Sequence, residues 1–335
     1  MRNRLHLSKR AWIIVFCALA GLLALVVVFH DNPRANPTEE LYKKLILCGV
    51  ILGACLIFIR FYDKLTTLPF ELFDNRKLIW RLAKNDFRKR YATSYLGAFW
   101  ALVHPVVTVV MYWFVFQNFL GQTGRQEVAA GIDLPYVVFL TAGLVPWFYF
   151  SEAWANGTTS LLEYNYLVKK VVFKISILPM IKVIAATFVH LFFALILLVL
   201  AACYGIFPTV YTIQILYYSF CLFVLVLGMS YVTCSLVIFF GDLQQIIAII
   251  LQVGMWATPI LWNITFIADK PWLVKIIKLN PLVYIVNGYR SCLVEKTWFF
   301  YDFFSTVYFW IVTVVIFGIG ALMFKRLKPQ FADVM

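Results

Sequence analysis

The sequence carries little charge. Of its 335 residues, only 13% are Asp, Glu, Lys or Arg, roughly half the share found in an ordinary soluble domain. Hydrophobic residues make up 63%, more than one water-soluble core can bury, because such a core must still be covered by a wetted surface. The same apolar surplus excludes an intrinsically disordered chain. The composition therefore predicts an all-α polytopic membrane protein.

Signatures of catalysis and of metal or nucleotide binding are also missing. The seven cysteines match no CxxC or Cys/His spacing, and no P-loop motif GxxxxGK[ST] is present. We find no arrangement of a nucleophile with a base. The 59-residue stretch 183–241 has no charged side chain, which argues against a proton- or sodium-driven carrier. We therefore expect no catalytic residue, metal or cofactor in this chain, and any transport energy would come from a partner.

Long apolar runs instead predict eight membrane spans. One span needs about 20 apolar residues, and stretch 183–241 is long enough for two, with a turn at Gly205-Ile-Phe-Pro208. An even number of spans places both termini on the same side. The predicted spans are 11–29, 45–59, 97–118, 134–154, two within 183–241, 243–262 and 303–324.

The basic residues predict which side that is. Lys and Arg number 29 against 16 Asp and Glu, a net charge of +13. With alternating spans, 20 basic residues fall on the side of the termini and nine on the other, while the acidic residues divide equally. Basic loops stay in the cytoplasm, so we expect both termini there. The charge thus reflects orientation in a membrane, and no nucleic-acid partner is expected.

Segment 71–91 has the pattern of an amphipathic helix. Apolar residues such as Ile79, Ala83 and Phe87 recur at four-residue spacing, and the other face is basic. We expect it to lie at the cytoplasmic interface, near anionic headgroups. It would either only anchor and orient the chain or also cradle a partner or a lipid-linked substrate. The cations assigned to the headgroups are Arg81, Lys84, Arg88, Lys89 and Arg90.

The connection 155–182 is predicted to be cytoplasmic and is more apolar than a solvated loop. Asn156 or Thr158 would cap a short helix over 161–167. An apolar loop outside the membrane favours docking on a partner, although packing beneath its own bundle would explain it too. The candidate coupling residues are Leu161, Leu162, Glu163, Tyr164, Tyr166, Lys169 and Lys170.

The outer segment 263–302 is predicted to contain two short helices that dip back from the outer surface. One begins near Pro271, and Asn280-Pro281 is a start signal for the other. Irregular backbone at membrane depth must be covered by protein or water, so the segment would form an outer gate or, alternatively, a surface cap. The candidate gate residues are Trp272, Asn280, Pro281, Tyr289 and Arg290.

Aromatic residues make up 18% of the chain, and several lie near span ends. Sugar rings stack on such side chains, so the pattern is typical of a carbohydrate path. An ordinary interfacial belt would look the same. The candidate channel residues are Tyr112, Trp113, Phe116, Trp147, Tyr149, Trp154, Trp256 and Trp262.

Short motifs in a fixed order resemble the membrane permease subunits of type-2 ABC exporters for polysaccharides and teichoic acids. The resemblance covers roughly residues 72–335. It depends on the order and spacing of the motifs, since each motif alone is weak. They include Leu78-Ile-Trp-Arg-Leu-Ala-Lys-Asn-Asp86, Ser94-Tyr-Leu-Gly97, Gly143-Leu-Val-Pro-Trp147, Thr258-Pro259, Asn280-Pro281 and Leu327-Lys-Pro-Gln-Phe.

The resemblance implies a multi-pass subunit of the bacterial cytoplasmic membrane that moves a lipid-linked glycan outward through an aromatic-lined channel. Its six-span core, 96–335, would pair as a homodimer and dock two copies of an ABC ATPase, which bind ATP and Mg. Residues 71–95 would be the interface helix, 155–182 the coupling segment and 263–302 the re-entrant segment.

Two further points concern this resemblance. Residues 1–70, with two extra spans, precede the family core. The tail and region 91–100 look most like Gram-positive relatives, which favours teichoic acid or a related wall polymer as the cargo. O-antigen or capsular polysaccharide is the alternative cargo, and a membrane-embedded transferase of envelope synthesis is the alternative function.

Overall fold

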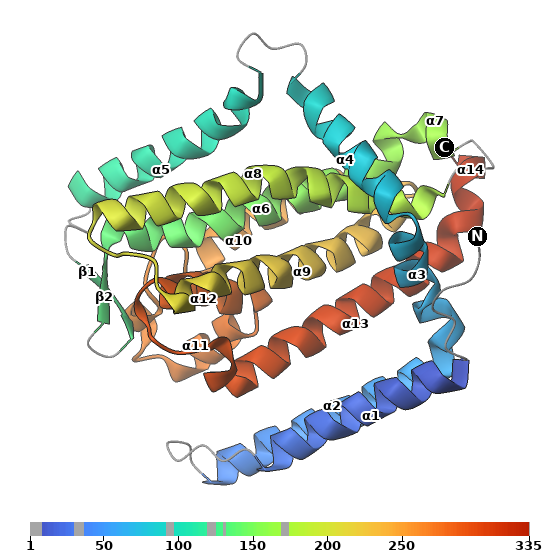
Figure 1. The fold of residues 1–335 in the computed structure, drawn as a ribbon, viewed down its shortest axis with the longest axis horizontal. Coiled ribbons are helices and arrows are strands. Elements are labelled where there is room, and N and C mark those ends of the chain that lie inside the picture. Colours follow the sequence, from blue (N-terminus) through green and yellow to red (C-terminus); the bar gives the residue numbers. More distant parts are fainter. Residues whose placement is uncertain are drawn as a thin grey trace. The chain divides into compact units, whose positions relative to one another are not determined.

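The computed structural model describes residues 9–29, 37–91, 97–118, 125–129, 132–168 and 174–334. These residues are almost entirely helical (Figure 1). The chain divides into two compact units, Met1–Phe70 and Glu71–Met335.

The first unit contains a helical hairpin. Helix α1 (Lys9–Phe29) packs along α2 (Pro37–Leu65), and the rings of Phe16 and Phe58 stack with their centroids 3.9 Å apart. Helix α2 is interrupted by non-helical backbone at Phe61. Most apolar side chains of α1 remain exposed, as expected for helices that are surrounded by lipid rather than water.

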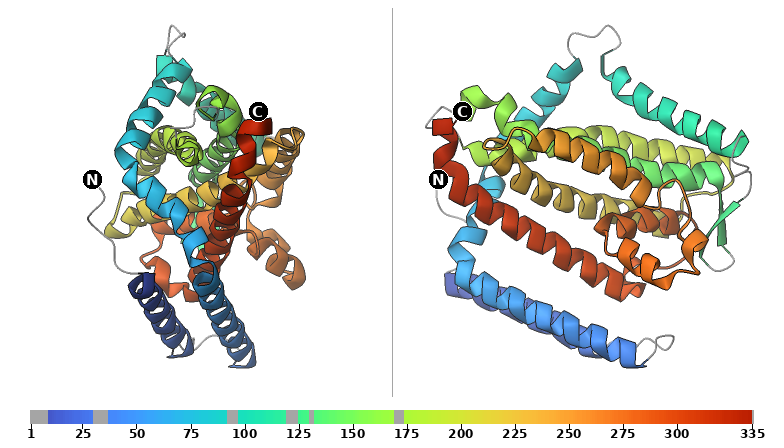
Figure 2. Two further views of the ribbon diagram at one scale, coloured as in Figure 1. Left: turned by 90° about the vertical axis from the view of Figure 1, so that its right-hand side faces the viewer. Right: turned by 180° about the vertical axis from the view of Figure 1, so that it is seen from behind.

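The core of the second unit is a bundle of four long helices. Helix α6 (Tyr136–Glu163) packs against α8 (Leu178–Cys203) and α9 (Gln214–Val237), and α9 packs against α13 (Phe303–Leu327). The helices run alongside one another in all three views (Figures 1 and 2). Helix α6 is the most deeply buried, with apolar side chains covered along nearly its whole length.

Shorter elements surround this bundle. At one end lie α7 and α14, and at the other lie the antiparallel strands β1 and β2 with α11 and α12 (Figure 1). The remaining helices and strands are α3 (Thr67–Asp74), α4 (Arg76–Tyr91), α5 (Trp100–Asn118), β1 (Arg125–Ala129), β2 (Ile132–Pro135), α7 (Asn165–Val168), α10 (Leu243–Ala257), α11 (Pro271–Lys278), α12 (Pro281–Val294) and α14 (Phe331–Val334).

Glycines lie at close contacts between the helices of the bundle. A Cβ atom added at Gly320 of α13 would lie 2.8 Å from the carbonyl oxygen of Gly228 in α9. At Gly157 of α6, it would lie 2.2 Å from Oγ of Ser230, also in α9. Small residues allow helix backbones to approach closely where burial of apolar surface cannot drive association. Helix α9 is therefore in close contact with both neighbours, with α13 through its backbone at Gly228 and with α6 through the Ser230 side chain.

The apolar helices correspond to the predicted spans, although the count of eight stays a prediction. Among the described residues, five helices are long and apolar enough to cross a membrane: Lys9–Phe29, Tyr136–Glu163, Ile175–Cys203, Val210–Val237 and Phe303–Gln330. The other three predicted spans coincide with shorter apolar helices, Lys44–Leu56, Pro105–Phe116 and Leu243–Ala257. The turn at Gly205 is present, with a φ of 80° that suits glycine.

Three predicted boundaries were wrong. Helix α6 does not end at Trp154 but continues to Glu163, so Asn156 and Thr158 lie inside it and cap nothing. Helix α10 ends at Ala257 instead of Trp262, because Thr258 is extended and a proline follows it. The basic segment is divided between α3 and α4, which meet at Asn75.

The glycine contact between α9 and α13 yields a stability prediction. Substituting Gly320→Ala inserts a methyl group against backbone atoms that cannot move aside, and such overpacking costs about 1–3 kcal/mol. We expect a lower thermal unfolding temperature for the full chain in detergent. The matched control is Gly53→Ala in α2, where nothing lies within 4 Å of the new Cβ. Equal unfolding temperatures for the two variants would contradict the packing described above.

Candidate functional site

A charged cluster joins α4, the end of α6 and the beginning of α8. At its centre is Lys182 of α8, whose side chain is only 6% exposed. Its Nζ atom donates hydrogen bonds to Oδ1 of Asp86 at 2.8 Å and to Oε2 of Glu163 at 2.6 Å. A buried ammonium group is stable only when it is paired and hydrogen-bonded. Two carboxylates from two other helices meet that requirement.

Tyr164 is a further partner of Asp86. Its hydroxyl group donates to Oδ1 of Asp86 at 2.6 Å, and Nζ of Lys182 lies 5.1 Å from the centroid of its ring. Burial, and next the Asp86 carboxylate, raise the pKa of Tyr164 above its ordinary value. The phenol therefore stays protonated and continues to donate at neutral and mildly alkaline pH.

A second set of contacts reinforces the same junction. Arg90, at the C-terminal end of α4, donates to the Glu152 carboxylate on α6 and lies 3.6 Å from Oδ2 of Asp86. Ser176 donates to the Glu71 carboxylate, and the hydroxyl group of Tyr231 donates to the backbone oxygen of Ser176 at 2.6 Å. Helices α3 and α4 are thus held to the bundle by the side chains of Glu71 and Arg90.

The structure separates the predicted coupling residues. Leu161 is fully buried inside α6, and Glu163 and Tyr164 belong to the charged cluster. Leu162 is half-buried, whereas Tyr166 on α7 is 58% exposed. Among the described coupling residues, Tyr166 therefore offers the largest accessible ring. Lys169 and Lys170 lie outside the described residues.

The predicted interface cations also divide. Arg90 pairs with carboxylates of the charged cluster, while Arg81, Lys84, Arg88 and Lys89 are exposed on α4. The apolar face predicted for this helix is confirmed at Ile79 and Ala83, which are buried. Contact of the four exposed cations with lipid headgroups stays a prediction.

The aromatic channel candidates fall into two groups. Trp147, Tyr149 and Trp154 are buried in the core around α6, and the ring of Trp147 contacts Gly254 of α10. The other group lies on α5 and around α10 and is exposed or half-buried: Tyr112, Trp113, Phe116, Trp256 and Trp262. Within one chain only this second group has accessible surface, and a channel role stays a prediction for all eight.

Arg290 organises the predicted gate segment. The side chain is 3% exposed and donates to three backbone oxygens, those of Phe139 at 3.2 Å and of Pro259 and Ile260 at 2.7 Å. It also lies 3.5 Å from the ring centroid of Phe139. One guanidinium group thus joins α12 to α6 and to the irregular backbone after α10.

The other gate candidates lie on α11 and at the beginning and middle of α12. The side chain of Asn280 caps α12 by accepting from the backbone nitrogen of Leu282, and Pro281 is the first residue of the helix, as predicted. Tyr289 is fully buried, and its hydroxyl group hydrogen-bonds to Ser219. Trp272, on α11, is 62% exposed.

Sequence reasoning missed Lys182 and Asp86 as a pair. The sequence places Lys182 at the end of the connection 155–182 and Asp86 in the basic segment 71–91, and nothing in it indicates that the two pair. Two signals were present in the sequence: Lys182 is a lone charge among apolar residues, and Asp86 is the only acidic residue between Arg76 and Arg90. A lone charge in an apolar helix needs a partner.

A bundle of apolar helices with a charged cluster at one end is the architecture of a multi-pass membrane protein. Comparison with known proteins gives the family. Residues 77–294 match the family model described as ABC-2 type transporter. The match spans most of the second unit, and the chain belongs to this family. It is therefore a type-2 ABC export permease, a transport subunit whose family works with an ABC ATPase partner.

Curated relatives agree over nearly their full length. An O-antigen export system permease protein RfbA of Klebsiella pneumoniae is 27% identical over 259 residues, which are 76% of this chain and 93% of the relative. The RfbA protein of Myxococcus xanthus is 25% identical over 264 residues, 78% of this chain and 97% of the relative.

The charged cluster yields a second stability prediction. Substituting Lys182→Met leaves Asp86 buried without its ammonium partner, which costs about 3–5 kcal/mol when a buried pair is broken. We expect a large fall in the thermal unfolding temperature of the full chain in detergent. Lys77→Met, at an exposed position of α4, is the matched control and should change it little.

A double substitution separates pairing from packing. Removing both charges, with Lys182→Met and Asp86→Leu, should recover part of the lost stability, because no uncompensated charge then remains buried. Additive losses in the double variant would show that Lys182 and Asp86 do not interact.

Proposed function

We propose that this chain is the permease subunit of an ATP-driven exporter that carries a lipid-linked cell-surface polysaccharide out across the bacterial cytoplasmic membrane. The observation that carries the proposal is the match to O-antigen export permeases over 93–97% of their length. Teichoic acid, favoured by the sequence motifs, appears in none of the relatives' names. O-antigen or a related polysaccharide, which the sequence motifs left as the alternative cargo, is therefore the proposed cargo.

The junction of α4, α6 and α8 supports a docking role for the end of the bundle at α7. Helix α6 has 28 residues and is about 42 Å long, compared with about 30 Å for the hydrocarbon core. It therefore extends beyond the membrane, where α7 presents Tyr166. A partner ATPase that binds α7 would act on α6 directly and, through the charged cluster, on α4 and α8.

The exposed helices support a homodimer. Helix α10 buries only Ile247, and most of its other apolar side chains are exposed, as are many on α5. These two helices also carry the accessible channel aromatics Tyr112, Trp113, Phe116 and Trp256. We propose that a second copy faces α5 and α10, so that the glycan path lies between the two copies. In this proposal both termini are cytoplasmic, as the distribution of basic residues predicts. Each copy would dock one ATPase, which binds ATP and Mg.

Docking at α7 can be tested by purifying the chain from its natural host and probing for a co-purifying ABC ATPase. Tyr166→Glu adds charge to the exposed ring site, so we expect loss of the co-purifying ATPase and of its stimulation by the permease. The matched control is Tyr301→Glu, at a tyrosine that is 70% exposed in the predicted outer segment. Equal retention of the ATPase by both variants would rule out contact at α7.

The cargo can be tested by removing the gene from its natural host. We expect loss of one surface glycan and accumulation of the same glycan, linked to lipid, inside the cell. Compositional analysis should show a polymer of glycosidically linked sugars. A lost polymer with a polyol-phosphate backbone would instead identify teichoic acid. An unchanged surface combined with loss of an enzymatic transfer activity would favour the transferase alternative.

A further inference from the structure

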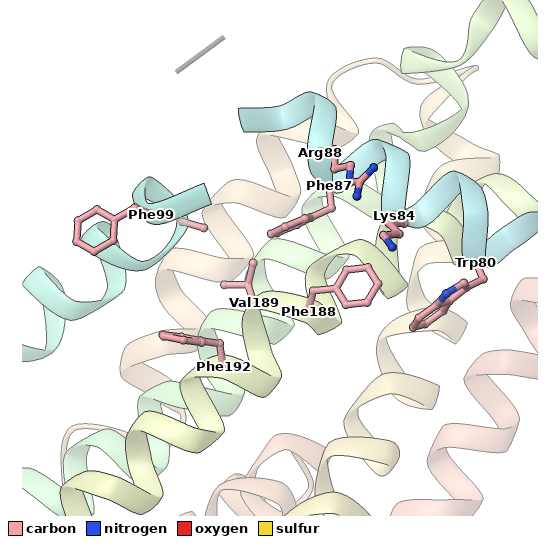
Figure 3. Close-up of a pocket in the computed structure, with 9 residues that line it drawn as sticks. Trp80, Lys84, Phe87, Arg88, Phe99, Phe188, Val189 and Phe192 are labelled. Atoms are coloured by element: carbon pink, nitrogen blue, oxygen red, sulfur yellow. The ribbon is translucent and has the colours of Figure 1, made fainter. Parts of the chain in front are cut away.

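A groove with a volume of about 740 Å³ lies between α4, α8 and the beginning of α5. Its size falls within the range of about 300–1,000 Å³ that is typical of small-molecule sites. Figure 3 shows aromatic side chains from all three elements around it. These rings are Trp80 and Phe87 from α4, Phe99 from the turn before α5, and Phe188 and Phe192 from α8.

The rings form a continuous apolar surface. The ring of Phe188 lies edge-on to Trp80 at 5.3 Å and to Phe87 at 5.7 Å between centroids. Trp80 is 55% exposed and Phe99 is 58% exposed, so the groove is open to its surroundings. Apolar side chains further along α8 are exposed as well, at Leu195 and Val199. The groove therefore continues into an apolar ridge along a predicted span.

Two cations lie at the same place. Lys84 and Arg88 line the groove, and with Trp80 they follow at four-residue intervals, which places all three on one face of α4. Within the part of the chain that the structure describes, neither cation has an ion-pair partner, in contrast to Arg90. The groove thus combines an apolar floor with two positive charges that no described carboxylate neutralises.

This combination fits an amphiphile. Among the described residues, the charged groups lining the groove are Lys84 and Arg88, and no described carboxylate there would accept hydrogen bonds from the hydroxyl groups of a free sugar. A hydrocarbon chain needs no acceptor, and a phosphate group is recognised by Lys and Arg. The continuation along exposed α8 residues favours a molecule that enters from the bilayer. The lipid that surrounds these helices in greatest amount is a phospholipid.

We propose that the groove is a binding site for one anionic phospholipid of the cytoplasmic leaflet. Its phosphate group lies between Lys84 and Arg88, and one acyl chain lies against Phe188 and Phe192. The proposal assigns a defined site to two of the cations on α4 and leaves Arg81 and Lys89 with general attraction to the membrane. It goes beyond the proposed export function and does not depend on the cargo.

The site lies on the helix that also holds the charged cluster. Lys84 and Arg88 face the groove, whereas Asp86, between them in the sequence, is buried and faces Lys182. Lipid bound on one face of α4 would thus hold the helix from the side opposite to its ionic contacts.

The test is native mass spectrometry of the full chain, delipidated in detergent and titrated with phosphatidylglycerol or phosphatidylcholine. We expect one tightly bound phosphatidylglycerol per chain and weaker binding of phosphatidylcholine. The double variant K84Q/R88Q should weaken phosphatidylglycerol binding by about fivefold for each cation removed. The matched control R81Q/K89Q removes the same charge from the same helix and should change the affinity less than twofold. Equal weakening in the two double variants would show general electrostatic attraction and overturn the proposal.

Two further measurements test the groove itself. Ala101 also lines it, so Ala101→Phe narrows the groove without a change in charge and should weaken binding by a similar factor. Undiminished affinity in that variant would place the lipid elsewhere. Stronger binding of a polyprenyl phosphate than of phosphatidylglycerol would assign the groove to the lipid carrier of the cargo and overturn the assignment to a membrane phospholipid.

Discussion

The need to neutralise one buried ammonium group determines how three elements of this protein are arranged. Lys182 lies near the beginning of α8, where its side chain is only 6% exposed, and a charge there is stable only with close partners. Its partners are Asp86 on α4 and Glu163 at the end of α6. Helices α4, α6 and α8 are thereby fixed to one another at the Lys182 side chain.

Part of the Lys182 cluster lies within the predicted coupling segment, 155–182, and burial in the same bundle explains part of the segment's apolar character. The segment looked like an independent apolar loop, but its first third is the continuation of α6. Leu161 is apolar because it is buried in the bundle, not because it binds a partner. Among the described residues beyond α6, the accessible ring is that of Tyr166 on α7. A partner that binds there, as proposed, would act at the end of α6, where the Glu163 carboxylate is bonded to Lys182.

The sequence predicted features that depend on local patterns. Apolar runs located the helices, the glycine at position 205 marked a turn, and the Asn280-Pro281 pair marked the beginning of α12. It did not predict features that depend on distant partners. Asp86 and Lys182 are 96 residues apart, and Arg290 bonds to backbone oxygens 30, 31 and 151 residues away. The spacing of apolar residues along the sequence does not indicate which distant residues pair. The exposed and buried aromatic residues likewise look the same in sequence, because either environment favours a large apolar ring.

The close contact at Gly157 has a mechanical consequence. A Cβ atom at this position would overlap the Ser230 side chain, so α6 and α9 leave no clearance between them near the end of the bundle where α7 lies. Two helices in such contact cannot slide past each other without first separating. A displacement applied at α7 would therefore tilt α6 and α9 together, and α13, held to α9 through Gly228 and Gly320, would follow. The displacement would reach the opposite end of the bundle as a rotation of these three helices as one rigid body. The hydrogen bonds from Arg290 to the backbone oxygens of Phe139, Pro259 and Ile260 would be the first contacts there to be strained.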